Sequence, residues 1–172
     1  MAKPDSPAGT AALAALARAG VAYTVHEYAH TPGETHFGRE GVSQLGLDPK
    51  RVFKTLLAKA AGAGGASRLA VGVVPVAGQL DLKALAAAVG AKKAAMAEPA
   101  EAERATGYVV GGISPFGQKA KLPTVVDASV LGFPTVYVSA GRRGLQVEVA
   151  PADLVRLTGA KTAPITRWGA GA

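Results

Sequence analysis

Lys54 is the residue whose type and surroundings point most directly to chemistry. We expect residues 51–58 (RVFKTLLA) to form a strand, and Val52, Leu56 and Ala58 then lie on the same face as Lys54. A lysine among apolar groups either extends its ammonium group to water or points into a cleft. At the edge of an apolar cleft, an ammonium group is a fixed charge for a phosphate or a developing oxyanion. The pattern alone leaves both interpretations open.

A glycine-rich loop at 111–115 (GGISP) is the second candidate. It follows the apolar residues 108–110, which we expect to form a short strand. Gly111 and Gly112 lack side chains, so that another group can approach the backbone or φ can be positive. Exposed N–H groups there could bind a carbonyl oxygen or a carboxylate. An ordinary turn is also compatible with this composition, and the dinucleotide-binding pattern G-x-G-x-x-G is absent.

Serine and metal chemistry have weaker support. Neither Ser114 nor Ser139 lies in a G-x-S-x-G motif, so a serine triad would depend on long-range folding. The histidines are His26, His30 and His36. Two of them on one strand, four residues apart, would be about 13 Å from each other, too far for one ion. We therefore expect surface or cleft-lining histidines and no metal site.

The composition limits the class of protein. A chain of 172 residues suits one domain, and the absence of cysteine excludes disulfides, thiolate zinc sites and a cysteine nucleophile. No apolar run approaches the roughly 20 residues that span a bilayer. The polar start, residues 1–5, lacks the apolar segment of a signal peptide. We expect a soluble cytoplasmic protein with no membrane partner.

The formal net charge of +7 favours a polyanionic partner such as nucleic acid. A basic surface that only aids solubility is the alternative. The basic residues come in close pairs: Lys50 with Arg51, Lys92 with Lys93, Lys119 with Lys121, and Arg142 with Arg143.

The elements that must position these residues include both hairpin-like and strand–helix units. Thr10 and Asp81 are expected helix N-caps, and Gly20 and Gly90 are expected to end the same helices. In the last strand, alternation predicts that Gln146 faces outward. Helices are expected within 9–20, 33–47, 81–90, 98–107 and 151–159. Strands are expected at 21–28, 51–58, 68–76, 122–127, 134–139 and 145–150, with a flexible hairpin-like loop at 60–67.

These elements predict an α/β protein of the α+β type. We expect a single domain over residues 1–172, with a mixed, largely antiparallel β-sheet or partial barrel flanked by helices.

Taken together, several segments resemble the YbaK family, freestanding relatives of the editing domain inserted in bacterial prolyl-tRNA synthetases. The resemblance runs from about Leu13 to Ile165 and keeps the family order. Its segments are VHEYAHTPGETHFG, VFKTLLA, VVPVAGQLDLKALAAAVGAKKAAMA, TGYVVGGISPFGQKAKLPTVVD and VYVSAGRRGLQVEV. The family activity it implies is removal of cysteine from mischarged Cys-tRNA(Pro). Cysteine is close to proline in volume, so the aminoacylation site of the synthetase cannot exclude it by size.

The resemblance also implies site residues. The family's essential lysine matches Lys54, and its G-x-x-x-P loop matches 111–115. The implied catalytic residues are Lys54, Gly111 and Gly112. The implied substrate-binding residues are Tyr28, His30, Phe37, Ile113, Ser114, Pro115 and Ser139. From the basic pairs, and not from the resemblance, we expect tRNA contacts at Lys119, Lys121, Arg142 and Arg143.

By the same resemblance, the substrate's own thiol attacks its ester and forms a cysteine thiolactone, with no cofactor, no metal and no DNA partner. The expected partner is mischarged tRNA(Pro), and a contact with prolyl-tRNA synthetase stays open. Two alternatives remain: a deacylase of other small aminoacyl-tRNAs, such as Ala-tRNA(Pro), that uses an activated water, and a non-catalytic RNA-binding module. Three features depart from the family pattern: the long loop 60–67, His36 at a usually small position, and Gln146 where an acid is expected.

Overall fold

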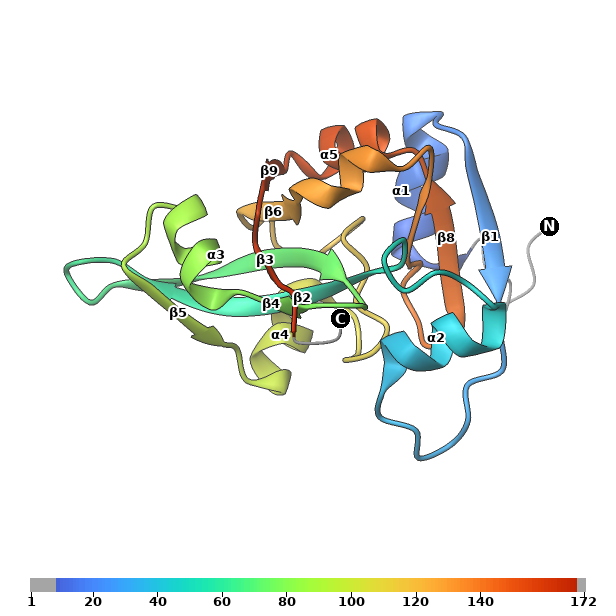
Figure 1. Cartoon of the computed structure of the whole chain (residues 1–172), viewed down its shortest axis with the longest axis horizontal. Coiled ribbons are helices and arrows are strands. Elements are labelled where there is room, and N and C mark those ends of the chain that lie inside the picture. The colour runs from blue at the N-terminus through green and yellow to red at the C-terminus, as the bar shows by residue number, and fades with distance from the viewer. Residues whose placement is uncertain (1–8, 170–172) are drawn as a thin grey trace.

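The computed structural model describes residues 9–169, which form a mixed α+β domain with three separate sheets (Figure 1). The polar start at 1–5 lies outside the described residues. The α+β class with mixed and antiparallel pairing is confirmed, but the strands do not close into a barrel. None of the helices within 9–169 is long and apolar enough to cross a membrane.

The largest sheet has the order β5-β2-β3-β6-β9. Its centre is the antiparallel hairpin of β2 and β3, which extends from the body of the molecule as a long arm (Figure 1). Only residues 62–66 connect the two strands, so the expected loop at 60–67 is shorter at both ends. The strands are β2 (Phe53–Ala61), β3 (Ser67–Pro75), β5 (Lys93–Met96), β6 (Thr124–Asp127) and β9 (Lys161–Ala163).

Two smaller sheets complete the fold. The antiparallel sheet β1-β8-β7 comprises β1 (Tyr23–Glu27), β8 (Leu145–Val149) and β7 (Val136–Ser139). A parallel bridge between Val52 and Tyr137 joins it to the start of β2. The third sheet pairs β4 (Gln79–Leu80) with β10 (Thr166–Arg167), and neither of these strands was expected from sequence.

Two helices begin at the predicted N-caps, although the helix that begins after Asp81 has its C-cap at Val89, one residue before the expected Gly90. The Thr10 hydroxyl accepts a hydrogen bond from the Leu13 N–H at 3.1 Å, and Gly20 ends that helix with φ of +70°. Asp81 accepts a hydrogen bond from the Ala84 N–H at 3.0 Å. The helices are α1 (Ala11–Ala19), α2 (Phe37–Leu45), α3 (Leu82–Ala88), α4 (Pro99–Thr106), the 3₁₀ helix η2 (Ala128–Gly132) and α5 (Pro151–Thr158).

Two apolar cores lie on opposite faces of the large sheet. The main core packs α1 and α5 against the three-stranded sheet β1-β8-β7, which we call the small sheet. Phe53, Leu57 and Val73 from the hairpin complete this core. The second core packs α3 against the other face, where Leu85 meets Val74. The hairpin is therefore covered on both faces, which fixes the direction of every side chain on β2.

Residues 108–110 do not form the expected strand. The Tyr108 hydroxyl donates to the Phe116 carbonyl at 2.6 Å, and the Gly112 N–H donates to the Val109 carbonyl at 2.9 Å. These hydrogen bonds within the loop hold the segment in place without a partner strand. Gln146 is a second correction: it is buried and does not face solvent, because α2 covers that face of β8 at Gly41.

A buried carboxylate ties the C-terminal segment to the sheet. Asp127, only 3% exposed, accepts the Ile165 N–H on one oxygen and the Ser129 N–H on the other, both at 3.0 Å. Ile165 is fully buried, so its N–H has no access to water. The segment that carries β10 depends on this carboxylate for its position.

We expect Asp127→Ala to lower the free energy of unfolding by about 1–3 kcal/mol, because it leaves a buried N–H unpaired and removes the cap of η2. Urea denaturation measures the loss. Asp153→Ala is the control, since its ion pair with Arg156 is largely exposed and contributes little. Equal stability of the two variants would contradict the role of Asp127.

Candidate active site

A cleft of about 710 Å³ opens beside the first half of β2. The N-terminal turn of α2, the 110–113 loop and the C-terminal segment after β10 form its other walls. Lys54 lies in this cleft, between Val52 and Leu56, which line it too. Of the two interpretations that the sequence left open, the structure favours the cleft, whereas the catalytic role of Lys54 stays a prediction.

Lys54 is half-buried and makes no ion pair with any residue in 9–169. Burial lowers the pKa of its ammonium group, and the positive charge of Arg39 lowers it further. A charge that is partly desolvated and unpaired is available for an incoming anion.

The charges around the cleft have one sign. The cations Arg39, Lys54 and Arg167 contribute to its lining, and the part of the lining that the structure describes contains no Asp or Glu. A negatively charged ligand would meet only attraction here. This uniform sign favours a phosphate-bearing substrate over a cationic one.

The glycine loop is clamped against α2. Gly111 has φ of +91°, and a Cβ at this position would lie 2.6 Å from the Phe37 ring, so no other residue fits. Arg143 lies over the same ring, with Cζ 4.5 Å from its centroid, and its Nε donates to the Val110 carbonyl at 2.9 Å. Phe37 thus links the loop, α2 and the turn before β8.

Gly112 and Ser114 lie behind the cleft wall and do not line it. A Cβ at Gly112 would be 2.7 Å from the Arg142 Cα, so this glycine permits close packing of two backbone segments. Its N–H is already bonded to the Val109 carbonyl. Ser114 is fully buried, and its hydroxyl accepts the Phe116 N–H at 3.2 Å.

His30 supports the α2 wall from behind through Glu40. The His30 Nδ1 lies 2.6 Å from one Glu40 oxygen, and the Thr31 N–H donates to the other at 2.8 Å. Burial would raise the pKa of Glu40, but these hydrogen bonds and the charge of His30 outweigh it, so the pKa is lowered. The His30 ring also packs 5.7 Å from Phe37.

Ser139 and Gln146 form the polar end of the cleft. They are paired across β7 and β8, and both line it. The Ser139 hydroxyl accepts the Gly141 N–H at 3.3 Å. Gln146 hydrogen-bonds to Tyr28, which lies behind it, but within the described residues its Oε1 has no partner. Within the described residues, this oxygen and the Thr55 hydroxyl are the buried polar atoms of the cleft lining that lack a hydrogen-bond partner.

The structure thus divides the expected site residues into three groups. Lining the cleft are Lys54, Phe37, Gly111, Ile113 and Ser139. Lying behind its walls are Tyr28, His30, Gly112, Ser114 and Pro115. Outside the lining are the expected tRNA contacts Lys119, Lys121, Arg142 and Arg143, of which Arg143 clamps the loop.

The cleft residues that the sequence analysis did not assign to the site include Arg39, Gln146, Arg167 and Trp168. Arg39 lies two residues after Phe37, so the chain position was available as a clue. Trp168 is the only tryptophan of the chain, which could have drawn attention to it.

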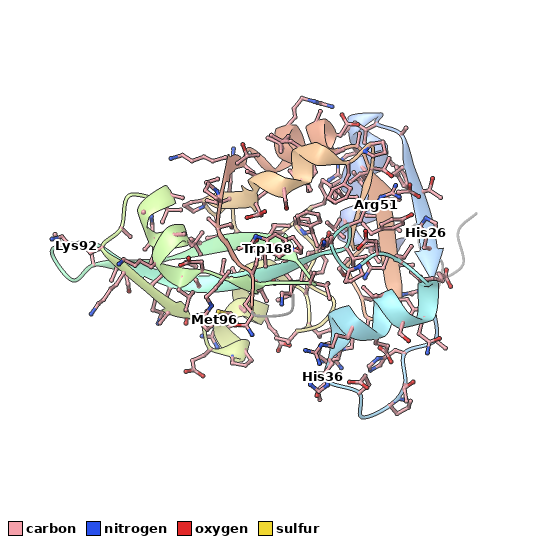
Figure 2. The ribbon with its side chains drawn as sticks, in the orientation of Figure 1. His26, His36, Arg51, Lys92, Met96 and Trp168 are labelled. Atoms are coloured by element: carbon pink, nitrogen blue, oxygen red, sulfur yellow. The ribbon has the colours of Figure 1, made fainter. Side chains whose placement is uncertain are left out.

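The histidines are paired individually with carboxylates, and no group of three potential ligands within 9–169 could hold a metal ion. Figure 2 shows His26 and Arg51 close together at the outer side of the small sheet, where both contact Glu148. The pairs are His26 with Glu148, His30 with Glu40, and His36 with Glu34.

A model of the aminoacyl-tRNA editing domain matches residues 33–157. The chain is 37% identical over 167 residues to EbsC of Enterococcus faecalis (strain ATCC 700802 / V583), assigned as a Cys-tRNA(Pro)/Cys-tRNA(Cys) deacylase, covering 96% of this chain and 98% of EbsC. It is 32% identical over 120 residues to the multifunctional Ser/Thr-tRNA deacylase ProXp-y of Escherichia coli (strain K12), covering 69% and 71%. A crystal structure of a protein assigned as a trans-editing enzyme for prolyl tRNA synthetase aligns with TM-score 0.75 and 27% identity, over 91% and 95% of the two chains.

The unpaired charge of Lys54 leads to a stability prediction. We expect Lys54→Met to raise the free energy of unfolding at pH 7 because it removes a partly desolvated cation from an apolar wall. Water still reaches the ammonium group and screens its charge, so the gain should be about 1 kcal/mol or less. The folded pKa of Lys54 lies below its unfolded value, so the native protein loses this cost as pH rises through the folded pKa. The advantage of the variant should therefore shrink toward pH 10.

Urea denaturation of the wild type and Lys54→Met between pH 7 and pH 10 measures the difference in their free energies of unfolding. Lys59→Met is the control, because Lys59 lies on the same strand but is exposed and paired with Glu101. A Lys54→Met variant less stable than the wild type at pH 7 would show that the ammonium group is stabilised in place.

Proposed function

This chain belongs to the aminoacyl-tRNA editing domain family, and on that basis we propose that it is a trans-editing deacylase that removes cysteine from Cys-tRNA(Pro). The observation that carries the proposal is the half-buried, unpaired Lys54 in a cleft lined by cations and by no described carboxylate. The near full-length similarity to EbsC supports the choice of amino acid and tRNA. We also propose that residues 1–172 act as one editing domain, with mischarged tRNA as the partner.

The proposed chemistry needs a charge in the chain but no nucleophile from it. The substrate thiol attacks its own ester carbonyl, so that a C–S bond forms and the C–O bond to the ribose breaks. The thiol proton ends on the ribose oxygen, and the products are free tRNA and a cysteine thiolactone, which water then hydrolyses. The ammonium group of Lys54 offsets the negative charge on the carbonyl oxygen during the attack. An intramolecular reaction of this kind gains from the orientation that the cleft imposes.

The two candidate serines, Ser114 and Ser139, are poorly placed to act as nucleophiles. Cysteine is absent from the sequence. Ser114 is fully buried and bonded to the backbone of its own loop. Ser139 lines the cleft, but its hydroxyl accepts the Gly141 N–H, and neither hydroxyl has a histidine partner among the hydrogen bonds within 9–169. A positioning role suits Ser139 better than a nucleophilic one.

The unpaired Oε1 of Gln146 suits the aminoacyl group. An α-ammonium group donates hydrogen bonds, and a buried acceptor without a partner is stabilised when it receives one. An amide at this position attracts a cation less strongly than a carboxylate would, and it leaves the cleft without a negative charge.

A second candidate function follows from the similarity to ProXp-y. A Ser/Thr-tRNA deacylase cannot use a substrate thiol, so water must attack the ester. The same Lys54 would then stabilise the oxyanion. The two functions share the cleft and differ in the nucleophile.

The two candidate functions can be separated by single-turnover deacylation of Cys-, Ser- and Ala-tRNA(Pro) with identification of the products. We expect Cys-tRNA(Pro) to react much faster than the other two, because serine is nearly the same size but its hydroxyl is a far weaker nucleophile. S-alkylation of the cysteinyl thiol should stop the reaction. Equal rates for the three substrates would favour attack by water.

Lys54→Met should reduce the single-turnover rate by about 10²–10³-fold, the usual effect of removing one oxyanion-stabilising group. The Lys59→Met control should keep the wild-type rate, since Lys59 is outside the cleft and bonded to Glu101. Circular dichroism checks that both variants are folded. Turnover by folded Lys54→Met within a few-fold of the wild type would remove Lys54 from the mechanism.

A further inference from the structure

We propose that Trp168 is a stacking platform for a nucleobase at the 3′ end of the bound tRNA, with Arg167 and Arg39 placed for its phosphates. The inference rests on the proposed function to the extent that the ligand is the acceptor end of a tRNA. It adds a nucleotide-binding subsite to the cleft, in which Arg167 and Trp168 lie beyond the 33–157 range that the family model matches.

The first support is the exposure of an aromatic side chain at a binding cleft. Trp168 is 46% exposed and lines the cleft together with Met96, which is 49% exposed (Figure 2). The other large exposed apolar side chains in 9–169, Val109 and Leu131, are not part of the lining. A half-exposed indole beside a cleft leaves one face free for a flat ligand.

The second support is that the tryptophan is held in place. β10 pairs with β4, with Thr166 opposite Leu80 and Arg167 opposite Gln79. A Cβ at Gly78 would clash with the Thr166 methyl group, so the glycine lets β10 pack closely on this turn. The indole Cε3 would lie 3.4 Å from that Cβ, so the ring is beside the same turn. A ring that is already positioned loses little conformational entropy when a base stacks on it.

The third support is the charge beside the ring. The Arg167 guanidinium lines the cleft and uses one nitrogen to donate to the Gln79 Oε1 at 2.8 Å, which orients it and leaves further donors. Arg39 lies in the same lining, where no carboxylate of the described chain competes for the cations. An aromatic face next to guanidinium groups is the combination that binds single-stranded nucleic acid. An apolar peptide would gain nothing from these charges.

The test uses the fact that Trp168 is the only tryptophan. The probe is the trinucleotide CCA without an attached amino acid. It carries the bases and anionic phosphates of the tRNA 3′ end but has no aminoacyl ester to cleave. We expect saturable quenching of the intrinsic tryptophan fluorescence. Trp168→Leu should raise the Kd of fluorescently labelled CCA, measured by anisotropy, about 5- to 150-fold, which corresponds to ~1–3 kcal/mol per stacked base. Trp168→Phe should restore most of the affinity.

Leu131→Ala is the matched control, because Leu131 is 62% exposed but outside the cleft, and its Kd should be unchanged. A trinucleotide with an abasic 3′ position should bind wild type and Trp168→Leu with equal, weaker affinity. The proposal is overturned if CCA leaves the fluorescence unchanged at saturation, if Trp168→Leu binds CCA as the wild type does, or if the abasic probe binds the wild type as tightly as CCA.

Failure of this proposal and failure of the proposed function give different results. Quenching by CCA in a protein that deacylates none of the tested aminoacyl-tRNAs keeps the nucleobase subsite and rejects the enzyme. Deacylation of Cys-tRNA(Pro) with the same KM in Trp168→Leu and wild type rejects the subsite and keeps the enzyme.

Discussion

The ammonium group of Lys54 has to remain charged in a half-buried position without a counter-charge, and the arrangement of the cleft follows from that constraint. Backbone pairing fixes where the side chain starts, since Lys54 lies opposite Val74 in the β2–β3 hairpin. Apolar covers on both faces of that hairpin fix its direction. The absence of carboxylates from the described lining keeps the charge unpaired until a ligand arrives. A neighbouring aspartate would have stabilised the resting protein and competed with the substrate.

The loop opposite Lys54 is held just as tightly. Gly111 presses against Phe37, Arg143 covers the same ring, and the Gly112 backbone packs on Arg142. Glu40 then ties the helix that bears Phe37 to the segment before it. The loop was expected to present free N–H groups to the substrate, but the Gly112 N–H is used within the loop itself. Its contribution is the shape of the wall, because the two glycines allow close packing on the Phe37 ring and on the Arg142 backbone.

Sequence reasoning succeeded where the determinants are local. Thr10 and Asp81 cap their helices because the groups they bind lie three residues away. Alternation along β2 left open whether Lys54 reaches water or a cleft, and the structure places it in the cleft lining. Sequence reasoning failed where a distant segment decides. Residues 108–110 have strand composition but no partner strand, and Gln146 has a polar side chain but is covered by α2.

The basic pairs show the same limit. Arg51 is bound to Thr135 and Glu148, and Arg143 to Phe37 and Val110, so charge alone did not distinguish structural cations from those in the cleft. The cleft arginines Arg39 and Arg167 belong to no pair in the sequence and were overlooked for that reason. The two-residue strands β4 and β10 are too short for any periodicity to reveal.

Residues 161–168 dock on the large sheet through β9 and the Asp127 carboxylate, while their last side chains form a wall of the cleft. A change in this one short terminal segment would therefore reshape a wall of the cleft and leave Lys54 and the glycine loop in place.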